Sequence, residues 1–409
     1  MSTPPKVPLF LLALFMLSGT LAMHIFVPAL PQAARELGVS NAAMQLTLSA
    51  YVVGLALGQL THGPISDQYG RRPVLIAGMI LYTAAGLAAW LAPTIQMLTA
   101  ARLLQAFGGC AGMVLGRAIV RDQVAGDLKA GDLKAGDARA GVDAARRLSL
   151  MNLMVMAGPG LSPLLGTALA EATGWRSIFA ALCLLGLGNL LLVWRWLPET
   201  VRRETEGRRL ALGSYRFLLR SRPFLGFVIG GGAATTSVYA FIGAAPFIFV
   251  DQLHRPAHEV GLYLTINVLG AWFGSLAASR LVGQVAMRRL MTLANLLSCA
   301  AALVFLLFVL AGTLGVVSAL ASMLVLTFGA GIASPTALAE SMAVNPAAAG
   351  TASGLYGFSQ MAIGAICAAL AGVGPDPSLA VGIVLLGAGL LAQAAFWVAR
   401  RPASRPTAG

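Results

Sequence analysis

The stretch GPISDQYGRRP, residues 63–73, separates two apolar runs and decides the fold of the chain. Its glycines permit a tight reversal of the backbone. Asp67 is placed to cap or pair near a helix end, and Arg71 and Arg72 are of the type that holds the end of a membrane span on the cytoplasmic side. The stretch therefore predicts a short cytoplasmic connection between two membrane-spanning helices.

The composition supports a membrane protein. Of the 409 residues, 58% are hydrophobic and only 11% are charged, whereas soluble domains are about 45–50% apolar and about 25% charged. This argues against a soluble enzyme, a disordered protein and a secreted disulfide scaffold. The net charge of +13 can indicate nucleic-acid binding. Because the basic residues lie between apolar runs rather than on one face, the lipid bilayer explains them better and no nucleic-acid partner is expected.

A span needs about 20 mostly apolar residues, and the apolar runs between charges and Gly/Pro breaks predict twelve spans. Their predicted limits are 8–30, 43–62, 74–93, 96–117, 148–170, 177–196, 223–247, 259–281, 290–311, 314–337, 350–372 and 378–399. With the N-terminus inside, 24 of the 28 Lys and Arg residues fall in inside segments. The positive-inside rule then predicts a multi-pass protein with both termini cytoplasmic.

The spans form two sets of six around a basic central stretch. We expect an N-terminal bundle over 1–195, a cytoplasmic linker over 196–222 and a C-terminal bundle over 223–409. The segment RLVGQVAMRRLM, 280–291, repeats the Arg pair at the equivalent place and suggests a duplication. Two such halves with a binding site at their interface are a transporter design. The inside loop insert over 125–147 contains three copies of a five-residue repeat, and we expect a flexible, solvated loop, a tolerated insertion rather than a binding element.

Residues 63–73 resemble the signature loop of the major facilitator superfamily, G-x-x-x-D-x-x-G-R-R/K. Further similar segments are VPALP (27–31), RLLQAFG (102–108), GRAIVRD (116–122), GPGLSPLLG (158–166) and AGTASG (349–354). Together they are similar to the Bcr/CflA drug-resistance branch of the twelve-helix drug:proton antiporters. The resemblance implies an all-α membrane protein of two pseudo-symmetric six-helix bundles. It also implies proton-driven export of bicyclomycin, phenicols and sulfonamides.

The resemblance assigns a gating role to the signature loop, namely to Gly63, Asp67, Gly70, Arg71 and Arg72. It makes the segment over 158–166 the antiporter motif, thought to seal the interface of the two halves. The motif residues are Gly158, Pro159, Gly160, Pro163 and Gly166. Prolines kink a helix and glycines let a neighbour approach closely, so ordinary small-residue packing explains the same segment equally well.

Ionisable groups inside the bilayer are costly and mark functional sites. His24 and Arg102 lie at equal depth, roughly 9 Å below the outer surface, which makes contact plausible. Relatives of the resembled branch carry an acid where this chain has His24. We retain three roles for His24: proton carrier, since its charge changes near neutral pH; hydrogen-bonding partner of the substrate; or structural partner. The missing acid leaves proton stoichiometry and cation export open.

Polar, aromatic and adaptable side chains are candidates for lining a cavity, although each alone is more often packing material. The candidates are Gln45, Tyr51, Asn152, Tyr239, Asn267, Tyr356 and Gln360. The four cysteines lie inside apolar runs and are interpreted as buried small hydrophobes, with no metal site. No P-loop or catalytic motif is present, so no cofactor is expected.

We therefore expect a secondary active multidrug exporter of a bacterial inner membrane. It would work as a monomer and exchange small amphipathic drugs for protons. A metabolite or sugar exporter of the same fold, or a non-transporting membrane sensor, remains the alternative. A membrane enzyme is disfavoured.

Overall fold

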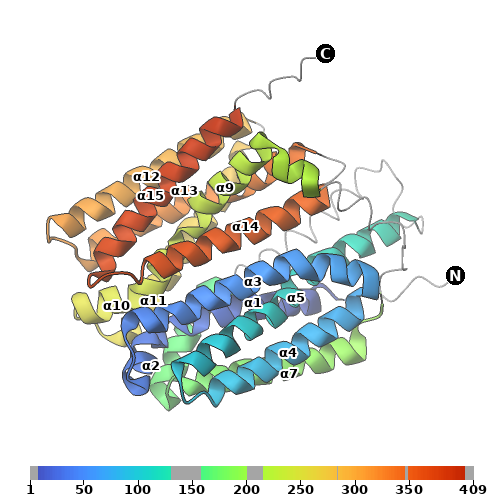
Figure 1. Ribbon diagram of the computed structural model, residues 1–409, viewed down its shortest axis with the longest axis horizontal. Coiled ribbons are helices and arrows are strands. Elements are labelled where there is room, and N and C mark those ends of the chain that lie inside the picture. The colour runs from blue at the N-terminus through green and yellow to red at the C-terminus, as the bar shows by residue number, and fades with distance from the viewer. Residues whose placement is uncertain (1–7, 130–157, 200–214, 283, 346–348, 401–409) are drawn as a thin grey trace. The chain divides into compact units, whose positions relative to one another are not determined.

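The computed structural model describes residues 8–129, 158–199, 215–282, 284–345 and 349–400. The chain divides into two compact units, one made of residues 1–40 and 50–205 and the other of residues 41–49 and 206–409. Both are helical, and the only strand-like feature in the described residues is an isolated bridge between Val282 and Val285. Figure 1 shows the course of the helices.

The helices of the first unit follow the predicted spans closely. They are α1 (Leu9–Ile25), the 3-10 turn η1 (Val27–Ala29), α2 (Leu30–Leu37), α3 (Asn41–Tyr69, whose first residues belong to the second unit), α4 (Arg71–Trp90), α5 (Ile95–Lys129) and α7 (Arg176–Trp196). A further helix over residues 158–173 precedes α7.

The second unit begins, within the described residues, with a short helix over residues 215–220. Its longer helices are α9 (Arg222–Thr236), α10 (Val238–Phe247), the π-helical turn η2 (Ile248–Gln252), α11 (Ala257–Leu281), α12 (Met287–Leu310), α13 (Val316–Ala343), α14 (Ala349–Leu370) and α15 (Pro377–Arg400).

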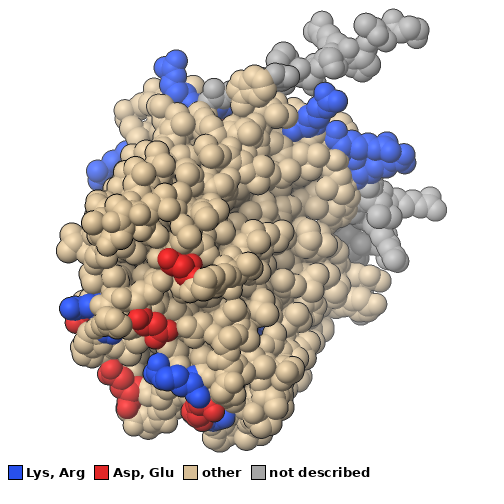
Figure 2. All heavy atoms as spheres, turned by 60° about the vertical axis from the view of Figure 1, so that its left-hand side comes forward, with Lys and Arg blue, Asp and Glu red and all other residues tan. Residues whose placement is uncertain are grey.

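Eleven segments of the described chain are long and apolar enough to cross a membrane. They match all the predicted spans except the fifth, 148–170. That span lies partly outside the described residues, and its described part belongs to the helix over 158–173. The prediction of an all-α membrane protein is confirmed. Most of the surface visible in Figure 2 is uncharged, as expected where lipid tails are the solvent.

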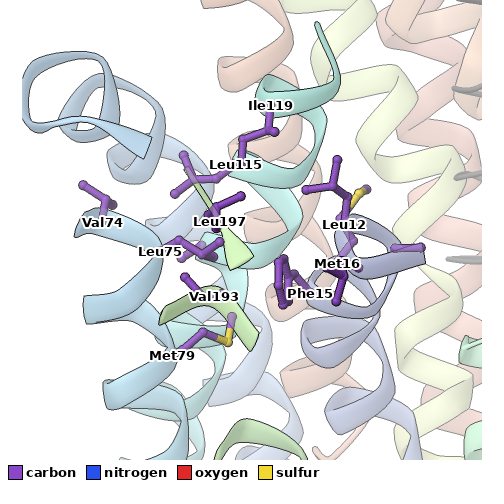
Figure 3. Packing of buried hydrophobic residues seen from close by; sticks show 13 residues of the cluster. Leu12, Phe15, Met16, Val74, Leu75, Met79, Leu115, Ile119, Val193 and Leu197 are labelled. Atoms are coloured by element: carbon purple, nitrogen blue, oxygen red, sulfur yellow. The ribbon is translucent and has the colours of Figure 1, made fainter. Parts of the chain in front are cut away.

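The core of the first unit is apolar where α1, α4, α5 and α7 meet. Figure 3 shows this cluster, in which Phe15 and Met16 of α1 lie beside Leu75 of α4 and Leu115 of α5. Each of these four side chains is at most 1% exposed. Glycines bring the backbones close: a Cβ on Gly54 would lie 2.3 Å from the Leu103 carbonyl oxygen. Membrane helices associate through such small-residue contacts.

Two expectations about helix ends are wrong. The predicted connection over 63–73 is almost entirely helical, since α3 continues through Pro64 to Tyr69 and α4 begins at Arg71. Only Gly70 makes the reversal, with φ of 100°, a conformation that favours glycine. The first copy of the five-residue repeat, residues 125–129, is also helical because α5 continues to Lys129. The rest of the insert lies outside the described residues.

Candidate functional site

Arg102 is buried in the first unit, and no acidic residue in the described part of the chain pairs with it. It lies on α5 with 1% of its surface exposed. Its Nη1 donates hydrogen bonds to the backbone oxygen of Ala22 on α1 and to Oε1 of Gln105, both at 2.9 Å. No carboxylate among the described residues contacts it, and its Nε and the Nε2 of Gln105 have no hydrogen-bond partner there. The charge is therefore only partly compensated.

Aromatic rings surround the guanidinium of Arg102. Its central carbon lies 4.0 Å from the ring centroid of Tyr51, 5.6 Å from that of Phe26 and 5.7 Å from that of Phe179. The rings come from α3, from the junction after α1, and from α7. Ring faces carry negative electrostatic potential and attract cations, more strongly when water is excluded. They replace part of the stabilisation that a carboxylate would give.

Side chains of neighbouring helices donate hydrogen bonds to α1 close to its contact with Arg102. Tyr51 donates to the Gly19 oxygen at 2.8 Å and Tyr82 of α4 to the Ser18 oxygen at 3.4 Å. Asn189 of α7 donates from Nδ2 to the Ser18 hydroxyl at 2.6 Å. With Arg102, four helices thus fix one segment of α1 through polar contacts.

The expected contact between His24 and Arg102 is not found among the described residues, where the two share no hydrogen bond, ion pair or ring contact. Arg102 contacts α1 through the backbone oxygen of Ala22, two positions before His24, and residues two apart on a helix do not face each other. Its Nδ1 lies 2.8 Å from the Thr20 oxygen. Because a carbonyl accepts, we assign the proton to Nδ1, which leaves the Nε2 lone pair to bind a proton. The side chain is 8% exposed.

The segment over 158–166, the predicted antiporter motif, packs against α1. Gly158 faces Leu17 and Thr20, and a Cβ on Gly166 would lie 1.8 Å from the Ile25 oxygen. Pro159, Gly160 and Pro163 lie in the same helix. The backbone oxygen of Thr20 also accepts the hydrogen bond from His24 Nδ1. The helix over 158–173, called the motif helix below, therefore covers the side of α1 that carries His24.

The residues of the predicted gating loop form an ion-pair cluster. Arg71 is buried, with Nη1 2.5 Å from Asp67 Oδ1 and Nε 3.2 Å from Asp122 Oδ2 near the end of α5. It also donates to the Ser66 hydroxyl. Gly63 is an ordinary helical residue with open space around it. The cluster ties the ends of α3, α4 and α5 together.

Glu199, just after α7, completes this cluster in a way that the sequence did not predict. Its carboxylate accepts from the backbone nitrogens of Arg71 at 2.9 Å and Arg72 at 3.2 Å. These are the first residues of α4, so Glu199 caps that helix from a distant position in the chain. Arg72 donates from Nη2 to the Trp194 oxygen at 2.8 Å.

Three cavity candidates of the second unit, Tyr239, Tyr356 and Gln360, lie where α14 packs against α9 and α10, whereas Asn267 contacts α13. Gln360 of α14 donates to the Thr235 hydroxyl at 2.7 Å. Tyr356 donates to the Ser334 oxygen at 3.4 Å, and Tyr239 packs its ring against Gly364. Asn267 of α11 is buried and its Oδ1 has no partner in the described chain.

Three cavity candidates remain, and one of them, Gln45, also belongs to the second unit. Gln45 of α3 is buried with an unpartnered Oε1. Tyr51 is one of the three aromatic residues around Arg102, and Asn152 lies outside the described residues. Within the part of the chain that the structure describes, no group of three or more His, Cys, Asp or Glu side chains could hold a metal ion.

Several residues that contact the predicted site residues gave a weak signal or none in the sequence. Gln105 lies in the segment 102–108, three residues after Arg102, so helical spacing could have predicted its contact with Arg102. Asp122 lies in the segment 116–122, and nothing in its position predicted its contact with Arg71. Phe26 and Phe179 gave no signal beyond being aromatic residues in spans. Glu199 had a weak one, since it is a carboxylate directly after a span.

Comparisons with known proteins agree with this architecture. The model of the Major Facilitator Superfamily matches residues 10–369. Multidrug resistance protein D of Escherichia coli is 30% identical over 94% of this chain and 93% of its own. A bicyclomycin resistance protein homolog of Haemophilus influenzae is 27% identical over 88% of each chain. An uncharacterized MFS-type transporter of Bacillus subtilis is 28% identical over 95% of this chain and 94% of its own.

Among solved structures, a D-xylose-proton symporter superposes with a TM-score of 0.72 at 14% identity, over 96% of both chains, which shows a shared fold. The predicted likeness to the drug-resistance branch is confirmed by the relatives. The spans and the bacterial relatives identify a multi-pass protein of the inner membrane. The chain belongs to the major facilitator superfamily and is a transporter, not an enzyme.

Proposed function

We propose that this transporter exports small amphipathic drugs, phenicol-like or bicyclomycin-like, in exchange for protons. The observation that carries the proposal is the polar centre of the first unit, where a buried Arg102 has aromatic partners and, among the described residues, no acid. Such a centre disfavours a second cation and accepts neutral, electron-rich groups. The printed names of the relatives, a multidrug resistance protein and a bicyclomycin resistance homolog, support the drug class.

His24 is the proposed proton carrier. A buried imidazole in a span is costly, which marks it as a functional candidate, and histidine is the side chain whose unperturbed charge change lies near neutral pH. Its Nδ1 contact with Thr20 leaves Nε2 to receive a proton. The motif helix over 158–173 covers the same side of α1, so protonation of His24 would act on packing between α1 and that helix. In this proposal the proton therefore travels beside the antiporter motif rather than through Arg102.

The ion-pair cluster of Asp67, Arg71 and Asp122 is the proposed latch for one gate state. It joins the ends of three spans through short, partly buried contacts. The inside location of this cluster, with both termini cytoplasmic, follows from the positive-inside rule. Alternating access would require the latch to form and break during each cycle.

Two measurements test the proposal. First, a pump-deleted host carrying this chain is challenged with phenicols, bicyclomycin, lipophilic cations and sugars. Resistance to the neutral drugs is expected, compared with an equally expressed Arg102→Ala control. Second, inverted vesicles are given a pH gradient and drug uptake is followed. Resistance without pH-driven uptake would refute the proton exchange but leave the drug export standing. A lack of resistance to every drug would refute the drug export itself.

A further inference from the structure

The short helix over residues 215–220 has an outer surface that is both apolar and basic. Leu218 is fully buried, so it fastens the helix to the second unit. Phe217 is 55% exposed and Leu219 is 52% exposed, and Arg216 and Arg220 are exposed between them. At about 100° per residue, Arg216 and Arg220 project from the side of the helix opposite Leu218. Phe217 and Leu219 project on either side of the two arginines.

This helix stands where a span begins. The span that contains α9 starts at Arg222, which is also exposed. Between the two helices, Ser221 is extended, with φ of −79° and ψ of 109°, and its hydroxyl accepts from the Phe224 nitrogen to cap α9. The chain therefore turns at Ser221, and residues 215–220 do not simply lengthen the span. Because they directly precede the first residue of a span, we place their side chains at the level where hydrocarbon gives way to headgroups.

The three arginines have no carboxylate partner in the described part of the chain. Arg216, Arg220 and Arg222 form no ion pair there, in contrast to Arg288 at the start of α12, which contacts Glu340. Unpaired guanidinium groups bind phosphate oxygens through parallel hydrogen bonds. Exposed aromatic and aliphatic side chains beside them suit the acyl region just below a headgroup.

We infer that this surface, made of Arg216, Phe217, Leu219, Arg220 and Arg222, binds the headgroup of an anionic phospholipid such as phosphatidylglycerol. Charge complementarity selects an anionic lipid over a zwitterionic one. The apolar pair selects a lipid over a soluble anion, because free phosphate gains nothing from Phe217 and Leu219. The lipid would hold the start of α9 at a fixed depth in the bilayer.

The test measures phosphatidylglycerol and phosphatidylcholine binding to the purified full chain by native mass spectrometry. We compare Arg216→Gln/Arg220→Gln with a matched control, Arg280→Gln/Arg289→Gln, which removes two exposed arginines of the same unit. Each arginine of this surface is expected to raise the affinity for phosphatidylglycerol about five-fold, equivalent to about 1 kcal/mol. The first variant should therefore lose phosphatidylglycerol affinity strongly and the control should not. Equal losses in both variants, or no preference for phosphatidylglycerol in the unmodified chain, would overturn the inference.

A second variant separates the lipid from a soluble anion. Phe217→Ser/Leu219→Ser keeps the arginines and should weaken phosphatidylglycerol binding while leaving competition by inorganic phosphate unchanged. If this variant binds the lipid as well as the unmodified chain does, and inorganic phosphate displaces it equally from both, the surface is a general anion site and the inference fails. The thermal midpoint in detergent, where no lipid is added, should stay the same in all variants because every substituted side chain is exposed.

Discussion

The charge of Arg102 costs folding free energy. A buried cation without an anionic partner is penalised, and replacing buried charges by apolar residues of similar volume is often neutral or stabilising. We therefore expect Arg102→Met to keep or raise the thermal unfolding midpoint while transport falls at least about ten-fold. Both quantities are measured on the same purified protein, the second after reconstitution into vesicles. A lower midpoint together with normal transport would show that Arg102 serves packing alone.

His24 offers a separate residue-scale prediction. If its Nε2 carries the coupled proton, His24→Ala should abolish drug uptake driven by a pH gradient into inverted vesicles. Drug binding at fixed pH should persist, because the hydrogen bond from Nδ1 to Thr20 is local to α1. Thr20→Val is the matched control, since it changes the same side of α1 without removing the imidazole. Unchanged pH-driven uptake in His24→Ala would remove the residue from proton coupling.

The two residues also show what the sequence could not supply. Equal depth suggested that His24 and Arg102 meet, and counting residues along a span gives depth reliably. Contact depends also on the rotation of each helix about its axis. The Ala22 oxygen and the Phe26 ring contact Arg102, and side chains two positions apart on a helix do not face each other, so His24 does not join these contacts. Packing against α5 and α7 sets that rotation, and the sequence of one span alone does not determine it.

Among the helices, α4 depends on a cap from another part of the chain. The carboxylate of Glu199 accepts from the first two backbone nitrogens of α4, and helix-capping groups typically contribute about 1 kcal/mol. Glu199→Ala should therefore lower the free energy of unfolding by about that amount. Glu199→Gln should lose less, because its amide retains one acceptor oxygen. Thermal unfolding in detergent checks both variants, and equal stability of Glu199→Ala and the unmodified chain would contradict the prediction.

Helix α15 provides a pH-dependent prediction. Asp376 precedes its first residue and accepts from the backbone nitrogens of Ser378 and Leu379 and from Gln252. Partial burial raises the pKa of Asp376, but these hydrogen bonds and the Ser378 hydroxyl outweigh burial and hold the pKa below its ordinary value. A lowered folded-state pKa stabilises the fold above the unfolded-state pKa of about 4. That contribution is lost as pH falls through the folded value.

The measurement is the thermal midpoint between neutral pH and the acid range. Asp376→Asn keeps an acceptor oxygen but cannot ionise, so the difference between it and the unmodified chain should shrink as the pH falls below about 4. A difference that stays constant over this range would show that ionisation of Asp376 contributes nothing to stability.

Span positions were predictable at the element scale, but helix ends were not. Hydropathy located the spans because lipid requires a long, internally hydrogen-bonded apolar helix. The Gly-Pro pair at 63–64 suggested a break, yet α3 runs on to Tyr69. The real reversal at Gly70 needs its positive φ and the distant Glu199 carboxylate beside it. The sequence supplies the glycine, while the cap depends on tertiary structure.

Across the whole chain, the two units repeat one device. In the first unit, Arg71 at the start of α4 pairs with Asp122 near the end of α5. In the second, Arg288 at the start of α12 pairs with Glu340 near the end of α13, with 2.9 Å between Nε and Oε2. The repeated Arg pairs in the sequence predicted the basic half of each contact. The acids lie about fifty residues later in the chain, so only the fold brings them together.

The charge balance of all the spans leads to a prediction about substrate choice. Apart from Glu259 at a helix end, the predicted spans contain no Asp or Glu, while Arg102 is buried inside one. At about 10 Å and an effective dielectric of about 20, its charge opposes a monovalent cation by about 1.7 kcal/mol, or about 15-fold in affinity. Neutral phenicols escape this penalty. We therefore expect vesicles to take up chloramphenicol but not tetraphenylphosphonium.

His24→Asp tests whether the missing acid causes this selectivity. A carboxylate on α1 offsets the Arg102 charge through the low-dielectric interior even without touching it, so tetraphenylphosphonium uptake should appear while chloramphenicol uptake persists. His24→Asn, which is similar in shape but cannot ionise, is the control and should leave the cation excluded. If the unmodified chain already carries the lipophilic cation as well as it carries the phenicol, the uncompensated arginine does not set the substrate charge, and another group must neutralise it during transport.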